Sequence, residues 1–134
     1  MRIQIANPTH YDYIFAKDKH VLKDLINSKI SNQEIYIIID EDICIGWLRY
    51  GYFWDNLPFM NMLWVDEEFR GKGYGKAVVA YWEQQMKGKG FETVMTSTLA
   101  NEQAQHFYRK LGYKDSGSLL LDDEPLEIIF TKKL

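Results

Sequence analysis

The sequence has a single cysteine, three prolines and no long run of apolar residues. Because Cys44 is the only cysteine among 134 residues, an intrachain disulfide framework and a multi-cysteine zinc site are both excluded. No stretch approaches the roughly 18 consecutive apolar residues of a membrane-spanning helix, and the opening residues lack a signal-peptide apolar region. We therefore expect a cytoplasmic protein with no membrane partner.

The chain also lacks an excess of basic residues. It carries 16 Lys and Arg against 19 Asp and Glu, a formal net charge of −3, so nucleic acid is not an expected partner. His10 and His20 show no metal-ligand spacing, and no metal is predicted. With 46% hydrophobic residues and no linker-like segment, residues 1–134 are expected to form one globular domain.

Hydrophobic periodicity predicts alternating strands and helices. A short strand around 3–5 precedes one or two amphipathic helices within 11–28, with a break near 17–19. The later predicted elements are strands at 35–40, 41–53 and 57–65, a helix at 76–87, a strand at 91–99, a helix capped by Asn101 and closed by Gly112, and strands at 113–121 and 127–131. This order predicts an α+β domain.

The most informative segment follows the strand that ends at Leu63-Trp64-Val65. After Asp66-Glu67-Glu68, which we expect to be a solvated turn, comes Arg70-Gly71-Lys72-Gly73-Tyr74-Gly75-Lys76 and then a helix. Glycines permit unusual backbone angles and remove side chains that would block a ligand, while unpaired amides at a helix start point outward. Together with three cations, these features predict an anion site that suits a pyrophosphate.

Two better-known glycine loops do not match this segment. A nucleotide-binding P-loop needs four residues between its glycines and then Lys-Ser/Thr, whereas Gly71 and Gly75 enclose three and are followed by Lys76-Ala77. A dinucleotide-binding fingerprint needs a glycine three residues after Gly73, where this chain has Lys76. Neither an Mg²⁺-nucleotide site nor a nicotinamide or flavin site is supported.

Two motifs stand out in this sequence: the first is Arg70-x-x-Gly73-x-Gly75, and the second comprises Asn101, Ala104, Phe107, Tyr108, Gly112 and Tyr113. Together they resemble the GNAT superfamily of acyl-CoA-dependent N-acetyltransferases. The first is similar to the superfamily's Q/R-x-x-G-x-G/A pyrophosphate loop, and the second to its N-x-x-A-x-x-F-Y-x-x-x-G-F/Y segment. The resemblance implies a mixed, mostly antiparallel twisted sheet of six to seven strands, splayed between the fourth and fifth, with about four helices.

The resemblance also implies the site residues and the cosubstrate, acetyl-CoA. Leu63 and Val65 would offer backbone groups to the pantetheine arm, and Asn101 would lie near that arm. Tyr108 would protonate the leaving thiolate. The pyrophosphate would be held by Arg70, Gly71, Lys72, Gly73, Tyr74, Gly75 and Lys76.

The reaction implied is transfer of an acetyl group to a primary amine by direct attack, with a small molecule or peptide as acceptor and a monomer or homodimer as the assembly. This sequence departs from the superfamily in lacking the glutamate base of some members, and Thr96 occupies one such place. We hypothesise a water chain held by Asn61, Thr96 or backbone carbonyls, with Asp55 or Glu127 as distant proton acceptors. The alternatives are a catalytically silent acyl-CoA-binding regulatory domain and a structural interaction module.

Overall fold

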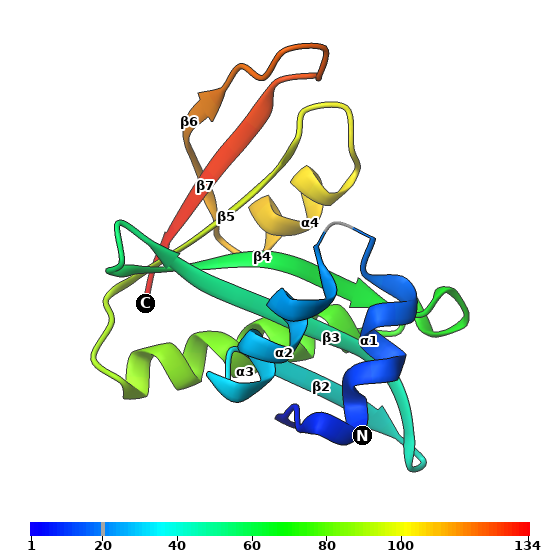
Figure 1. Cartoon of the computed structure of the whole chain (residues 1–134). Helices are drawn as coiled ribbons and strands as arrows, with labels where there is room; N and C mark the ends of the chain where they lie inside the picture. Colours follow the sequence, from blue (N-terminus) through cyan, green and yellow to red (C-terminus); the bar gives the residue numbers. More distant parts are fainter. Residues whose placement is uncertain (20) are drawn as a thin grey trace. The chain divides into compact units, whose positions relative to one another are not determined.

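The computed structural model describes residues 1–19 and 21–134, so His20 lies outside the described residues. It contains a seven-stranded sheet with the strand order β1-β2-β3-β4-β5-β7-β6, together with helices (Figure 1). The strands are β1 (Arg2–Ile5), β2 (Ile35–Asp40), β3 (Ile43–Phe53), β4 (Leu57–Val65), β5 (Thr93–Leu99), β6 (Lys114–Leu119) and β7 (Glu127–Lys133). The helices are α1 (Tyr11–Lys17), α2 (Lys23–Ser31), α3 (Tyr74–Gly88) and α4 (Ala104–Lys110), with short 3₁₀ turns η1 (Pro8–His10) and η2 (Glu67–Phe69).

The predicted fold class is confirmed. β1 pairs with β2, β2 with β3, β5 with β7 and β6 with β7, all antiparallel. β4 and β5 form the parallel pair, in which Phe59 lies opposite Met95 and Met60 opposite Thr96. In the part of the chain that the structure describes, the register partners of this pair end at Met60 and Thr96.

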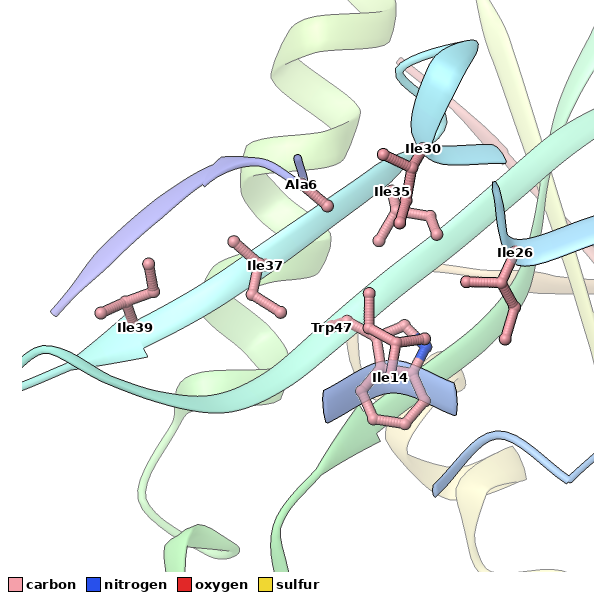
Figure 2. Packing of buried hydrophobic residues seen from close by; sticks show 8 residues of the cluster. All are labelled: Ala6, Ile14, Ile26, Ile30, Ile35, Ile37, Ile39 and Trp47. Atoms are coloured by element: carbon pink, nitrogen blue, oxygen red, sulfur yellow. The ribbon is translucent and has the colours of Figure 1, made fainter. Parts of the chain in front are cut away.

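The chain forms two compact units, and the first comprises Met1–Tyr50 and Met62–Trp82. Its core lies where one face of β2 meets α1 and α2, as Figure 2 shows. The residues of this cluster are Ala6, Ile14, Ile26, Ile30, Ile35, Ile37, Ile39 and Trp47. On the other face of β2 the ring of Tyr36 contacts that of Tyr81 on α3, with 5.3 Å between centroids. Burial of both faces explains why β2 is an almost continuous apolar run.

The start of η1 and α1 shows how His10 is used. The Asn7 side chain accepts a hydrogen bond from the Thr9 amide (2.9 Å), and His10 Nδ1 accepts one from the Asn7 amide (3.0 Å). These reciprocal bonds satisfy amides that a helix start leaves unpaired. Burial lowers the pKa of His10, which keeps the ring neutral for this capping role.

The second unit comprises Gly51–Asn61 and Glu83–Leu134. A polar cluster ties its parts together: the Tyr113 hydroxyl donates to Glu83 Oε2 (2.7 Å), and Lys132 Nζ lies 3.0 Å from Glu83 Oε1. The C-terminus of α3 is closed by Gly90, whose φ of +95° lets Phe91 N–H reach the Met86 carbonyl (3.1 Å). The sequence correctly predicted that glycines would end this helix.

Two kinds of structure are absent from residues 1–19 and 21–134. None of its helices is both long and apolar enough to cross a bilayer. Nor do these residues bring together three or more His, Cys, Asp or Glu side chains in a group that could hold a metal ion.

Candidate functional site

The glycine turn after β4 and η2 leads directly into α3. Gly71 and Gly73 have φ angles of +75° and +90°, and a Cβ atom at either position would meet nothing within 4 Å. Glycine therefore allows the shape of the turn and leaves its surface open. The first bond of the helical ladder runs from the Ala77 amide to the Gly73 carbonyl (3.0 Å), so α3 begins at Tyr74, two residues earlier than predicted. The amides of residues 74–76 precede this ladder and have no acceptor within the helix.

Three exposed cations lie on the glycine turn and the start of α3, and one of them is directed back onto β4. Arg70 Nε donates to the Val65 carbonyl (2.7 Å), and its guanidinium lies 4.9 Å from the centre of the Trp64 ring. Lys72 and Lys76 are exposed on the turn and the first helical turn. Arg70 thus fastens the turn to the strand, while the two lysines add positive charge at the helix end that already favours anions.

Tyr74 anchors the first turn of α3 through its side chain. Its hydroxyl donates to Asp40 Oδ2 at the end of β2 (2.8 Å). This hydrogen bond raises the pKa of Tyr74 and lowers the pKa of Asp40. The side chain of Tyr74 is committed to Asp40, so its contribution to an anion site would come from its backbone amide.

Asp66 is part of a hydrogen-bonded network, and the prediction of a solvated turn was wrong for this residue. Asp66 Oδ1 accepts hydrogen bonds from Lys17 Nζ (2.6 Å) and Trp64 Nε1 (2.9 Å), and the carboxyl side chain is only 13% exposed. Burial alone would raise the pKa of Asp66, but these bonds lower it overall. The carboxylate therefore ties α1 to the end of β4, just before the glycine turn. No local sequence pattern indicated this role, because Lys17 lies 49 residues away in the chain.

Leu63 and Val65 lie on the half-buried end of β4, in the same unit as the whole of the Arg70 to Lys76 turn. The structure therefore brings these predicted ligand-binding residues together. The Val65 carbonyl is already used by Arg70, which leaves fewer of its backbone groups for a ligand.

Tyr108 lies on α4 in the second unit and is 7% exposed, more buried than its neighbour Phe107. Its ring packs against those of Tyr113 and Phe130, at centroid distances of 5.7 and 6.1 Å. Burial raises the pKa of Tyr108 to about 12, opposed in part by a hydrogen bond with Thr96. At neutral pH the hydroxyl therefore keeps its proton and is a potential proton donor.

Asn101 does not cap α4, which corrects the sequence prediction. The helix begins at Ala104, Gln103 occupies the N-cap position without a side-chain bond, and Asn101 is exposed in the preceding turn. The Gln105 side-chain amide donates instead to the carbonyls of Ala100 (2.7 Å) and Glu102 (2.9 Å). These bonds stabilise a separate turn before the helix, and the Asn101 side chain remains available to a ligand.

The four candidate groups for proton removal occupy different environments in the second unit. Thr96 is 1% exposed, and its hydroxyl donates to the Met60 carbonyl (2.9 Å). Asn61 is exposed on β4, Asp55 is exposed in the β3–β4 turn with a φ of +57°, and Glu127 is half-buried at the start of β7. The hydrogen bond from Thr96 to Met60 joins two strands and was not indicated by the sequence.

The match to a known family agrees with these features. Residues 3–113 match the Acetyltransferase (GNAT) family, and the chain belongs to this family. Its parallel β4–β5 pair and the glycine turn before α3 lie within the matched range.

Three individual proteins show the range of this similarity. The chain is 27% identical over 119 residues to the peptidyl-lysine N-acetyltransferase YjaB of Escherichia coli K12, covering 88% of this chain and 74% of that protein. The structure of Ard1 from Thermoplasma volcanium superposes with a TM-score of 0.87 at 15% identity, covering 99% and 97% of the two chains. A candidate streptothricin acetyltransferase from Bacillus anthracis, solved with acetyl coenzyme A, has a TM-score of 0.70 at 25% identity, covering 75% and 61%.

Proposed function

We propose that this chain is an N-acetyltransferase that moves an acetyl group from acetyl-CoA to a primary amine. The observation that carries the proposal is the open glycine turn, where Gly71 and Gly73 precede the unpaired amides of residues 74–76. Support also comes from the acetyl coenzyme A bound to the B. anthracis protein and from the description of YjaB as a peptidyl-lysine N-acetyltransferase.

In this proposal the turn binds the pyrophosphate of acetyl-CoA. The amides of residues 74–76 and the open backbone of Gly71 and Gly73 would face the phosphate oxygens, since helix N-termini favour anions. Lys72 and Lys76 would add charge, and Arg70 would act mainly by holding the turn on β4. Leu63, Val65 and Asn101 would contact the pantetheine arm through their polar groups.

Tyr108 would supply the proton that the leaving thiolate needs. A phenol that stays neutral far above physiological pH is a hydrogen-bond donor and a proton source, whereas a phenolate is neither. Its ring is fixed by Tyr113 and Phe130, which limits the freedom of the hydroxyl before reaction.

The amine would attack the thioester carbonyl directly, without an acyl-enzyme. The carbon–nitrogen bond forms, the carbon–sulfur bond breaks, and the thiolate takes the Tyr108 proton. The attacking nitrogen loses one proton, which we propose leaves through water near Asn61 toward Asp55 or Glu127. A proton returned to Tyr108 completes the balance: amine and acetyl-CoA give amide and coenzyme A.

The acceptor class is a primary amine on a small molecule or peptide, and we propose that residues 1–134 act as one domain, as a monomer or homodimer. An acceptor panel with acetyl-CoA tests the reaction: lysine peptides, free amino acids and polyamines, followed by thiol release and product mass. We expect thiol release to match the gain of one acetyl group. Tight acetyl-CoA binding without product from any amine would favour the silent regulatory domain. Absence of coenzyme A binding would contradict both functions.

A further inference from the structure

Thr96 is a buried hydroxyl at the position where the pairing of β4 with β5 stops. Its side chain is 1% exposed, and its Oγ1 donates to the Met60 carbonyl across the strand pair (2.9 Å). Met60 and Thr96 are themselves register partners in the parallel ladder. A buried hydroxyl with a satisfied donor still has an oxygen that can accept a second hydrogen bond.

Thr96 and Tyr108 have a common neighbour in Phe130. Thr96 pairs with Phe130 across β5 and β7, and the Tyr108 ring packs on Phe130 at 6.1 Å. Thr96 therefore bonds the Met60 carbonyl and shares the Phe130 surroundings of Tyr108, all within the second unit. In agreement with this placement, the Thr96 side chain lowers the pKa of Tyr108 and so partly offsets the effect of burial.

We propose that Thr96 is a positioning residue for Tyr108: its single hydroxyl hydrogen rests on the Met60 carbonyl and turns onto the Tyr108 oxygen once Tyr108 has given its proton away. This inference rests on the proposed acetyltransferase function. Thr96 has one hydrogen and two possible acceptors, a neutral carbonyl and a phenolate oxygen. The charged acceptor makes the stronger bond, so ionisation of Tyr108 reverses the preference.

The step requires no group beyond those already described. Tyr108 O–H transfers its proton to the thiolate sulfur, giving a thiol and a phenolate. The Thr96 O–H bond stays intact throughout, and only its direction changes. When Tyr108 regains a proton, the Thr96 hydrogen returns to the Met60 carbonyl and restores the starting arrangement.

A set of variants tests whether Thr96 acts on Tyr108 through its hydroxyl or only fills space in the core. Thr96→Val removes the hydroxyl at nearly constant volume, and Thr96→Ala compared with Thr96→Ser tests the same atom if the valine variant does not fold. Thr98→Val is the matched control, because Thr98 is also buried on β5 (7% exposed) and lies two residues along the strand. With an amine found in the acceptor panel, we expect Thr96→Val to lower kcat about tenfold, with an unchanged KM for acetyl-CoA. We expect the kcat values of Thr96→Ser and Thr98→Val to stay within about twofold of the value for the parent protein.

The decisive comparison repeats Thr96→Val in a Tyr108→Phe background. If Thr96 acts through the Tyr108 oxygen, the second substitution causes no further loss of kcat once that oxygen is gone. An equal loss in both backgrounds would show that Thr96 acts only through packing and would overturn the proposal.

A titration that needs no amine acceptor tests the role of Thr96 separately from the proposed acetyltransferase function. Difluorotyrosine at position 108, whose phenol is more acidic than tyrosine, is titrated by its phenolate absorbance in the whole chain. We expect Thr96→Val to raise the pKa of that phenol by about one unit, and Thr96→Ser and Thr98→Val to leave it unchanged. Glu102, whose charge also acts on Tyr108, is the same in all variants. An unchanged pKa in Thr96→Val would refute the Thr96 proposal even if the enzyme is active, whereas absence of turnover in the parent protein would refute the proposed function.

Discussion

The glycine turn and the surroundings of Tyr108 differ in almost every physical respect. The turn is open and is shaped by positive φ angles at Gly71 and Gly73, and in the proposed function it would bind a ligand through its backbone amides. Tyr108 is buried among rings, and its proposed role would depend on one side-chain oxygen. A backbone site binds an anion with few demands on side-chain identity, whereas a proton donor needs one particular group in one particular environment. We therefore expect changes in the turn to alter affinity and changes at Tyr108 to alter turnover.

The largest expected effect is that of Tyr108→Phe on turnover. Loss of a positioned proton donor should lower kcat about 100-fold, with little change in the KM for acetyl-CoA. Steady-state kinetics with a fixed saturating amine measures both constants. Tyr113→Phe is the control, since that hydroxyl is bonded to Glu83 and has no proposed chemical role. Equal losses of kcat in both variants would contradict the proposal that Tyr108, and not Tyr113, is the proton donor.

The next effect concerns Gly73→Ala. Its Cβ would enter the space where the phosphate should lie, at a φ of +90°, so the Kd for coenzyme A should rise about tenfold or more. Isothermal titration measures this change, and kcat at saturating acetyl-CoA should stay close to the parent value.

Gly90→Ala is the matched control for Gly73→Ala. Gly90 also has open surroundings and a similar φ of +95°, so both variants carry the same kind of backbone strain, about 1–2 kcal/mol. Both should lower the free energy of unfolding, and only Gly73→Ala should weaken coenzyme A binding. Equal Kd values for the two variants would show that the turn does not hold the ligand.

A smaller change is expected for the exposed cation Lys72. Lys72→Ala should raise the Kd for coenzyme A roughly threefold at low salt, because an exposed charge contributes little in water. Added salt should weaken binding by the parent protein and reduce the difference between the two proteins. Lys89→Ala, which changes a lysine beyond the end of α3, should leave the Kd unchanged. A salt-independent Kd would contradict a charged binding turn.

The smallest expected effect is on the pH dependence of turnover. Because the pKa of Tyr108 is raised to about 12, its proton is retained below that value and lost only as the pH rises through it. Ionisation of Tyr108 should therefore cause no fall in kcat between about pH 7 and pH 10. A kcat profile that falls within this range in the parent protein but not in Tyr108→Phe would contradict the raised pKa.

The sequence correctly predicted the features that depend on residues close together in the chain. The glycine spacing at 71–75 indicated the turn, and apolar periodicity indicated the order of helices and strands along the chain. The roles of Asp66 and Thr96 depend on partners distant in the chain, Lys17 and Met60, that no local pattern identifies. The prediction that Asn101 caps α4 was wrong, because the Gln105 side chain stabilises a separate turn before the helix. Interactions between distant residues therefore limited the prediction of the site more than that of the fold.

The most direct measurement follows the backbone amides of residues 71–76 by ¹H–¹⁵N NMR during titration with coenzyme A and, separately, with pantetheine. Pantetheine lacks the diphosphate, so our account predicts large, saturable shifts of these amides with coenzyme A and none with pantetheine. Saturable coenzyme A binding that leaves the amides of 71–76 unmoved would contradict it.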